Sequence, residues 1–233
     1  RQIESFSGYA FCKAHSASFA MVSYRIAYLK AHYPTEFMAA VLSNQGGFYD
    51  TAAYIEEARR MGIRILPPHI NQSVNEFTAH GTFIRVGLSQ VKGLKKNTAV
   101  AIIKTRQGKP YRSLINFLSR IDITKPEAEA LIRCGALDGL DSSRPEMLWI
   151  LKIFSKQKNS PLLASPLKIK EYTLREKLQA ELEHLNLTVS DHLLTLYDID
   201  NTNIVSASGL SRFAGRIVTL SGWLVTTKQT LTV

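Results

Sequence analysis

Apolar residues recur at helical spacing near the start of the chain. Intervals of 3, 4, 3 and 4 separate Phe19, Val22, Ile26, Leu29 and Tyr33. Such spacing places all five side chains on one stripe of an amphipathic helix. The pattern therefore predicts a helix over residues 16–33 whose apolar face is buried.

Two more helices and a small β-hairpin are predicted downstream. Pro34 suits the first turn of a helix over residues 34–42, because its missing N–H would have no intrahelical partner there. A third helix over residues 50–61 is closed by Gly62, a typical C-terminal cap. Two short β-type runs then flank a His-Gly turn, which indicates a β-hairpin over residues 77–86.

The hairpin leads into VGLSQVKGLKKNTAVAIIKTR, residues 86–106, which has the pattern of a helix-hairpin-helix. In this motif the first N–H groups of the second helix lack internal partners and point outward toward a DNA phosphate. Gly93 lets the backbone approach closely, whereas Lys95 stands where the usual turn has a second glycine. The predicted DNA-binding residues are Lys92, Gly93, Lys95, Lys96, Asn97, Lys104 and Arg106.

A second helical pair is predicted over residues 113–121 and 126–134. The turn between the two helices contains no glycine. The pair is therefore either a second DNA-binding unit or a packing partner of the first.

The rest of the chain changes character twice. Residues 155–166 contain two prolines and several small polar residues, which is typical of a linker, and a charged helix is predicted over residues 172–186. From Gly209 onward β-branched residues predominate. The run GRIVTLSGWLVTTKQTLTV predicts two strands of a β-barrel.

Composition excludes several classes of protein. The chain has 233 residues, 45% of them hydrophobic, and no apolar run reaches the roughly 18 to 20 residues of a bilayer span. Cys12 and Cys134 stand alone, and the six histidines have no ligand-like spacing, which argues against a structural disulfide or zinc site. We expect an intracellular protein. Since the sequence begins at Arg1 and ends inside the β-rich run, we also expect it to be part of a longer protein.

The net charge of +10 is unevenly distributed. Between Glu76 and Asp122 there is no acid, but there are nine bases: Arg85, Lys92, Lys95, Lys96, Lys104, Arg106, Lys109, Arg112 and Arg120. A nucleic-acid backbone is the natural complement of this segment, although a solvated basic face or affinity for an anionic membrane would give the same composition.

The run FSGYAFCKAHSASFAMVSYRIAYLKAHYPTEFMAAVL, residues 6–42, resembles the fingers domain of the alpha subunit of bacterial DNA polymerase III, a C-family replicative polymerase. The resemblance continues through EEARRMGIRILPPHIN, the helix-hairpin-helix region and LIRCGALDGLDSSRPEML, and is weakest over residues 154–203. It implies a DNA-directed DNA polymerase that extends a primer from deoxynucleoside triphosphates with Mg2+. It also implies cytoplasmic partners: duplex primer-template DNA, a sliding clamp and other polymerase III holoenzyme subunits, with no membrane.

Together, pattern and resemblance predict a mainly α fold. It comprises a helical fingers segment, a small β-hairpin, a tandem helix-hairpin-helix and the first strands of a truncated OB-type β-barrel. The expected domains are the C-terminal part of the fingers at 1–72, the DNA-binding domain at 73–158, a linker and connecting helix at 159–205, and the start of the OB domain at 206–233.

The resemblance also implies contacts with the incoming nucleotide. Tyr9, Lys13 and His15 match the nucleotide-binding face of the fingers, where a ring can stack on a base or sugar and cations can meet phosphate oxygens. The alternative is that His15 caps the following helix and Tyr9 packs in the core. Cys12 stands where the family usually has Asn.

The family carries a short clamp-binding peptide after the helix-hairpin-helix region. Gln157, Leu162 and Leu163 lie in the corresponding part of this sequence, although their spacing and lack of an aromatic residue fit a plain linker better.

We predict no catalytic residue and no metal ligand in this chain. Two-metal catalysis needs clustered carboxylates, and the one D-x-D, Asp198 and Asp200, lies among turn formers and is interpreted as a loop. Three functions stay open: part of a replicative polymerase, part of an error-prone paralogue, or a stand-alone, non-enzymatic DNA-binding adaptor.

Overall fold

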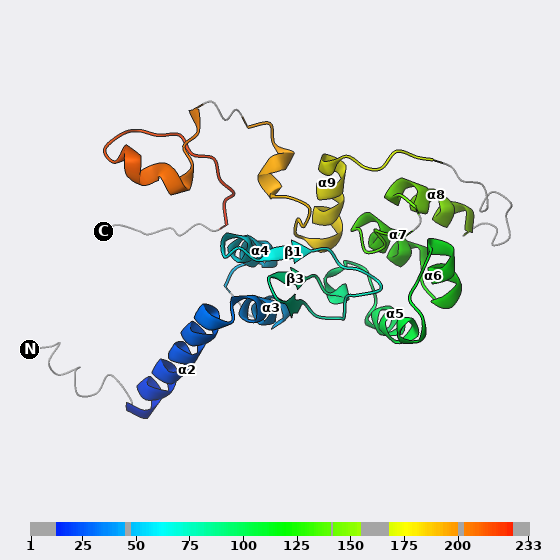
Figure 1. Cartoon of the computed structure of the whole chain (residues 1–233), viewed down its shortest axis with the longest axis horizontal. Helices are drawn as coiled ribbons and strands as arrows, with labels where there is room; N and C mark the ends of the chain where they lie inside the picture. The colour runs from blue at the N-terminus through cyan, green and yellow to red at the C-terminus, as the bar shows by residue number, and fades with distance from the viewer. Residues whose placement is uncertain (1–12, 45–47, 141, 155–167, 200–202, 226–233) are drawn as a thin grey trace, which may run out of the picture.

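A computed structural model of the whole chain shows a mainly helical protein with one small sheet (Figure 1). The structure describes residues 13–44, 48–140, 142–154, 168–199 and 203–225. Helical content and the small hairpin agree with the predicted fold class.

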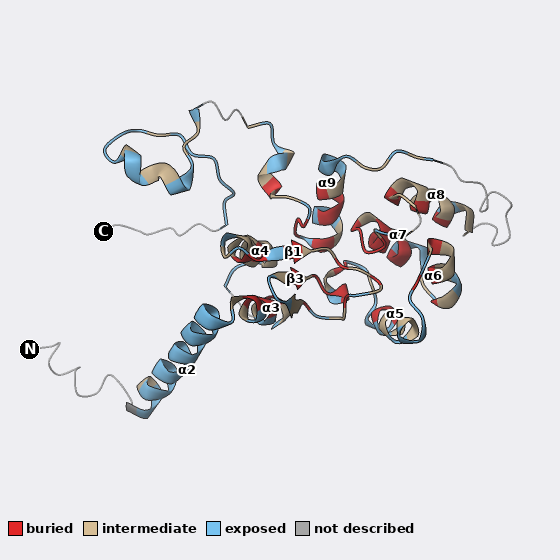
Figure 2. Cartoon of the chain, viewed as in Figure 1, coloured by how far each residue is buried: buried red, intermediate tan, exposed pale blue. Residues whose placement is uncertain are grey.

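The first helix, α2 (Lys13–His32), forms as predicted, but its apolar face is not buried. Phe19, Val22 and Ile26 are 60%, 51% and 48% exposed. The helix extends away from the body of the molecule and meets it near its C-terminal end (Figures 1 and 2). Among the described residues the prediction of a buried face is therefore wrong. Periodicity shows which side chains share a face, but not whether another element covers that face.

Two further helices lead to the sheet. Helix α3 (Pro34–Asn44) begins at its proline, as expected, and α4 (Thr51–Arg60) is capped by Asp50, whose carboxylate accepts from the Ala53 N–H at 2.9 Å. Gly62 adopts φ +79°, the left-handed conformation that ends a helix. The chain can therefore turn directly into the first strand.

The sheet has the strand order β1-β3-β2. Strands β2 (Thr78–His80) and β3 (Phe83–Arg85) form the predicted antiparallel hairpin. Strand β1 (Arg64–Leu66) pairs parallel to β3 and was not predicted, because three residues are too few for a period to appear. Helix α3 contacts this sheet, and Ser43 Oγ at its end donates to the Phe77 carbonyl at 3.2 Å.

The helical region beyond the sheet contains the predicted helices in the predicted order, and in addition α8 (Arg144–Phe154), which was not predicted. Its described residues contain the 3₁₀ turn η1 (Leu88–Gln90), followed by α-helices. These are α5 (Lys96–Gly108), α6 (Leu114–Arg120), α7 (Lys125–Arg133), α8 and α9 (Leu174–Leu185).

One apolar core joins the sheet to these helices. Buried side chains form a continuous cluster that runs from Met38 in α3 through Ile84 in the sheet and Ile102 in α5 to Leu185 at the end of α9. Because this core continues across residue 72, the proposed boundary between two domains there stays a prediction.

The C-terminal part is described up to residue 225. It contains the 3₁₀ helices η3 (Leu193–Leu196) and η5 (Ala207–Phe213) and an isolated parallel bridge between Ile204 and Thr219. The Val205 N–H donates to the Thr219 carbonyl at 3.0 Å. The predicted strand residues beyond 225 lie outside the described part of the chain.

Candidate nucleic-acid interface

The turn between η1 and α5 presents a helix N-terminus to solvent. Gly93 adopts φ +79°, and a Cβ built there would meet nothing within 4 Å. Lys95 is the N-cap of α5, but its side chain makes no capping hydrogen bond. The first N–H groups of a helix have no intrahelical acceptor, and this applies to those of Lys96 and Asn97, which are both exposed residues. This arrangement can accept an anion at the positive end of the helix dipole.

The nine bases of the acid-free segment divide into two groups. Three arginines bind backbone carbonyls: Arg85 donates to Pro67 at 3.1 Å, Arg106 to Ile70 at 2.7 Å, and Arg120 to Thr105 at 2.8 Å and Lys109 at 2.7 Å. The other six are exposed, namely Lys92, Lys95, Lys96, Lys104, Lys109 and Arg112.

Arg106 was predicted to bind DNA, and its side chain is half-buried. Burial also lowers the pKa of its guanidinium. With its hydrogen bond to the Ile70 carbonyl, Arg106 joins α5 to the loop between β1 and β2, which is a structural role. A count of charges in the sequence does not separate such an arginine from an exposed one.

Helix α9 supports the turn between η1 and α5, a contact that the sequence did not predict. The Lys92 N–H donates to the His184 carbonyl at 2.8 Å, and the Gln90 side chain donates to the Leu185 carbonyl at 2.7 Å. The last carbonyls of a helix lack intrahelical partners, so the C-terminal end of α9 is a natural acceptor. The segment expected to be a mere connection thus orients the turn.

The second helical pair has a different turn. Thr124 and Glu127 form a capping box at the start of α7, so the helix supplies its own N-terminal partners. None of the positive-φ residues among those described lies in this turn, residues 121–125. Glu127 further accepts hydrogen bonds from the Lys95 N–H at 3.0 Å and the Thr98 hydroxyl at 2.8 Å, which links the two pairs.

The chain is similar to known proteins over this region and beyond it. A family model described as a helix-hairpin-helix motif matches residues 62–147. The DNA polymerase III subunit alpha of Saccharopolyspora erythraea is 35% identical over 91% of this chain and 21% of its own length. That of Thermus aquaticus is 38% identical, over 84% of the chain and 18% of its own length. That of Mycobacterium leprae is 42% identical, over 60% of the chain and 12% of its own length.

The chain belongs to the DNA polymerase III alpha subunit family. This confirms the resemblance seen in the sequence. The chain spans about a fifth of the length of the curated relatives it matches first.

The residues that the polymerase III alpha resemblance singled out are only partly described. Tyr9 and the three clamp-peptide residues Gln157, Leu162 and Leu163 lie outside the described residues. Lys13 is the first residue of α2. His15 is exposed and lies inside the helix, where its ring packs edge-on against Phe19 with centroids 4.5 Å apart.

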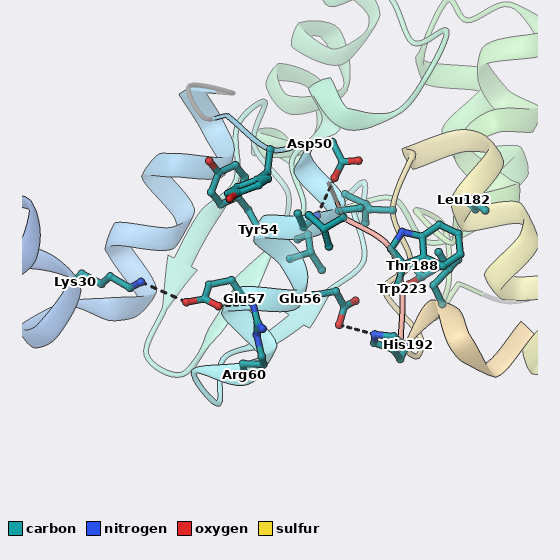
Figure 3. A pocket seen from close by; sticks show the side chains of 17 residues that line it. Lys30, Asp50, Tyr54, Glu56, Glu57, Arg60, Leu182, Thr188, His192 and Trp223 are labelled. Carbon is teal, nitrogen blue, oxygen red and sulfur yellow. Dashed lines mark hydrogen bonds and ion pairs between the residues drawn. The ribbon is translucent and has the colours of Figure 1, made fainter. Parts of the chain in front are cut away.

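The present chain also has a cavity of about 660 Å³ between α4 and the C-terminal segment (Figure 3). Its charged walls are internally paired: Glu57 with Lys30 at 3.3 Å and Arg60 at 2.6 Å, and Glu56 with His192 at 3.4 Å. Trp223 lines the same cavity. These contacts tie α2, α4 and the chain after α9 together.

The described part of the chain shows neither a cluster of metal ligands nor a membrane-spanning helix. No three His, Cys, Asp or Glu side chains lie close enough together there to hold a metal ion. Nor is any of the described helices long and apolar enough to cross a membrane.

Proposed function

We propose that this chain binds the phosphate backbone of duplex DNA, without sequence preference, through residues 92–97, as part of a DNA polymerase. The observation that carries the proposal is the left-handed turn at Gly93, which delivers the start of α5 to the surface with no side-chain cap. A phosphate there would accept N–H groups and meet the helix dipole.

Exposed cations around the turn add to this binding. Lys92, Lys95 and Lys96 flank it, and Lys104 lies on the exposed side of the same helix. Ammonium groups and backbone amides recognise phosphate oxygens, which are the same at every base pair, so the contacts carry no sequence information. Asn97, an exposed residue in the first turn of α5, is proposed to contribute its N–H, whereas Arg106 is left out because it is bonded to the Ile70 carbonyl.

The second helical pair is proposed as a packing partner. A helix start whose capping box occupies two N–H groups and holds a buried carboxylate has fewer donors to offer a phosphate and an unfavourable charge for it. Its proposed contribution is to hold the start of α5 in place through the hydrogen bonds that Glu127 accepts from Lys95 and Thr98.

The polymerase role comes from the relatives, which are named DNA polymerase III subunit alpha. We propose for the whole protein their DNA-directed DNA polymerase activity in the cytoplasm, with deoxynucleoside triphosphates and Mg2+ and with a sliding clamp and holoenzyme subunits as partners. Tyr9, Lys13 and His15 are proposed to contact the incoming nucleotide, and the exposure of His15 supports this. The DNA contacts proposed above use amides and cations and require no metal ligand from this chain.

Equilibrium binding at several salt concentrations tests the proposal. The chain should bind two duplexes of unrelated sequence with similar affinity. If four to six phosphates are neutralised, the slope of log affinity against log salt should be about −3.6 to −5.4. Affinity that does not change with salt, or strong preference for one duplex, would contradict it.

A further inference from the structure

Glu127 opens α7 but also holds the turn of the preceding helical pair. The side chain is buried, at 3% exposure. Its Oε2 accepts from the N–H of Thr124 at 3.1 Å and from the hydroxyl of the same residue at 2.6 Å. Its Oε1 accepts from the Lys95 N–H at 3.0 Å and the Thr98 hydroxyl at 2.8 Å. Each carboxylate oxygen therefore has two donors, and the two oxygens serve different helices.

A second capping box in the chain shows what a cap alone requires. At the start of α9, Glu176 accepts from the N–H and hydroxyl of Thr173 at 2.7 and 2.8 Å through one oxygen, Oε2. Glu176 is exposed. Local capping thus uses one oxygen, and the bonds from Oε1 of Glu127 to Lys95 and Thr98 are an addition to it.

These additional bonds fix the start of α5 from its buried side. Lys95 is the N-cap, so binding its N–H sets the direction in which the chain enters the helix. The Thr98 hydroxyl anchors the first turn at the same oxygen. Lys96 and Asn97 lie between these two anchors and remain exposed.

We propose that Glu127 is a positioning residue for DNA binding, which holds the α5 start so that the N–H groups of Lys96 and Asn97 face the phosphate. The inference rests on the proposed function of the turn. It deepens that function by giving the second helical pair a definite task. The carboxylate touches no DNA itself.

Charge and position predict opposite results when this carboxylate is neutralised. A negative charge near the positive end of a helix that binds phosphate opposes binding, so removing the charge alone should strengthen it. If Glu127 acts by position, loss of its bonds should weaken binding. The number of phosphates neutralised, and with it the salt slope, should not change.

The test compares Glu127→Gln with Glu176→Gln, the matched control at the other capping box. Duplex affinity is measured against salt, and amide hydrogen exchange is measured at Lys95, whose N–H is bonded to Glu127. Glu127→Gln should weaken binding and speed exchange there by about tenfold each, because buried donors lose a charged acceptor. Glu176→Gln should change neither.

Unchanged or tighter binding by a folded Glu127→Gln, with unchanged amide exchange, would overturn the inference. Thr98→Val provides a second variant that keeps the carboxylate and removes one donor. It should produce a smaller change in the same direction, and no change in either measurement would count against the inference. If wild type itself shows no salt-dependent binding, the proposed function fails, while the exchange measurement still decides whether Glu127 fixes the turn.

Discussion

At the scale of single residues, the basic segment shows how a side chain's chemistry decides its role. The guanidinium group carries several donors in a fixed plane, which suits backbone carbonyls in loops. Arg85, Arg106 and Arg120 are used in that way, and Arg120 also lies over the Tyr111 ring at 4.6 Å. The lysines of the segment stay exposed, which leaves their ammonium groups for phosphates.

Gly93→Val should weaken DNA binding without changing net charge. Valine disfavours the left-handed backbone and places methyl groups where a phosphate would approach, while its Cβ would meet no protein atom within 4 Å. Gly139→Val is the control, since Gly139 has φ +83° and a Cβ there would also meet nothing within 4 Å, but it lies in the loop between α7 and α8. Binding is measured at constant salt, with folding checked by circular dichroism. Equal losses for both variants would show that backbone strain alone is responsible.

Lys95→Ala and Lys96→Ala should act through charge. Each should reduce the magnitude of the salt slope by about 0.9 if its ammonium meets one phosphate. Titrations at four or more salt concentrations measure the slopes. If the lysine variants lose affinity while Gly93→Val binds as wild type, the basic patch binds DNA without the backbone of the turn.

At the scale of elements, buried polar groups decide how helices meet. Arg144 is 2% exposed and joins α8 to the end of α7. Its Nε and Nη2 donate to Asp138 at 2.9 and 2.6 Å, and its Nη1 donates to the Arg133 carbonyl at 3.0 Å. Gly135 is required here, since a Cβ would lie 2.2 Å from Arg144 Nη2. Every donor group named has an acceptor, so this buried cation is tolerated.

Asp138→Ala should lower the free energy of unfolding by about 3 to 5 kcal/mol, because it leaves Arg144 buried without its counter-charge. Glu129→Ala is the matched control. Glu129 pairs with Arg133 at 2.9 Å on the same helix, but both are about a third exposed, so the cost should stay below about 0.5 kcal/mol. Urea unfolding measures both. Similar losses for the two variants would disprove the role of burial.

The α7 start should also make stability depend on pH. Burial alone would raise the pKa of Glu127, but hydrogen bonds from Thr124, Lys95 and Thr98 lower it from 4.5 to about 2. A lowered carboxyl pKa adds stability that is complete above the unfolded-state pKa and is lost as pH falls through the folded-state pKa. The contribution near neutral pH is at most about 3 kcal/mol.

Glu127→Gln removes the titrating group, so its stability should fall less than that of wild type between about pH 5 and about pH 2. Urea unfolding midpoints across this range measure the difference. The other carboxylates titrate in both proteins and cancel in the comparison. Parallel pH profiles for variant and wild type would contradict the assignment.

At the scale of the whole molecule, one core and one uncovered helix coexist. The core joins the sheet to α5–α9 and so holds the proposed DNA-binding turn on a packed support. Helix α2 carries its apolar face outside this core, with Phe19, Val22 and Ile26 about half exposed or more. An apolar face of this size in contact with water is unusual for a folded protein.

Replacing Val22 and Ile26 by Gln should reduce binding of a hydrophobic dye to the chain. The free energy of unfolding should change by less than about 0.5 kcal/mol, because exposed side chains contribute little to it. Dye fluorescence and urea unfolding measure the two quantities, and far-ultraviolet circular dichroism checks that the helix persists. A loss above about 2 kcal/mol would show that this face is buried in the folded chain.

The sequence by itself determined the local elements and the family. Helix order and the helix-hairpin-helix turn follow from local chemistry, because each signal influences only the few residues around it. These signals are the apolar periodicity, the proline at the start of α3, and the glycines Gly62 and Gly93. Long runs such as residues 6–42 carried the resemblance that the comparisons confirmed.

Only the tertiary structure decided which predicted residues stand free and what supports them. Arg106 is bonded to the Ile70 carbonyl. The turn is held by Glu127, which lies 32 residues from its partner Lys95, and by Leu185 at the end of α9, which lies 95 residues from its partner Gln90. The exposure of the apolar face of α2 was likewise decided by the tertiary structure. Burial and long-range hydrogen bonds depend on which elements come together in space, and a local pattern contains no information about that.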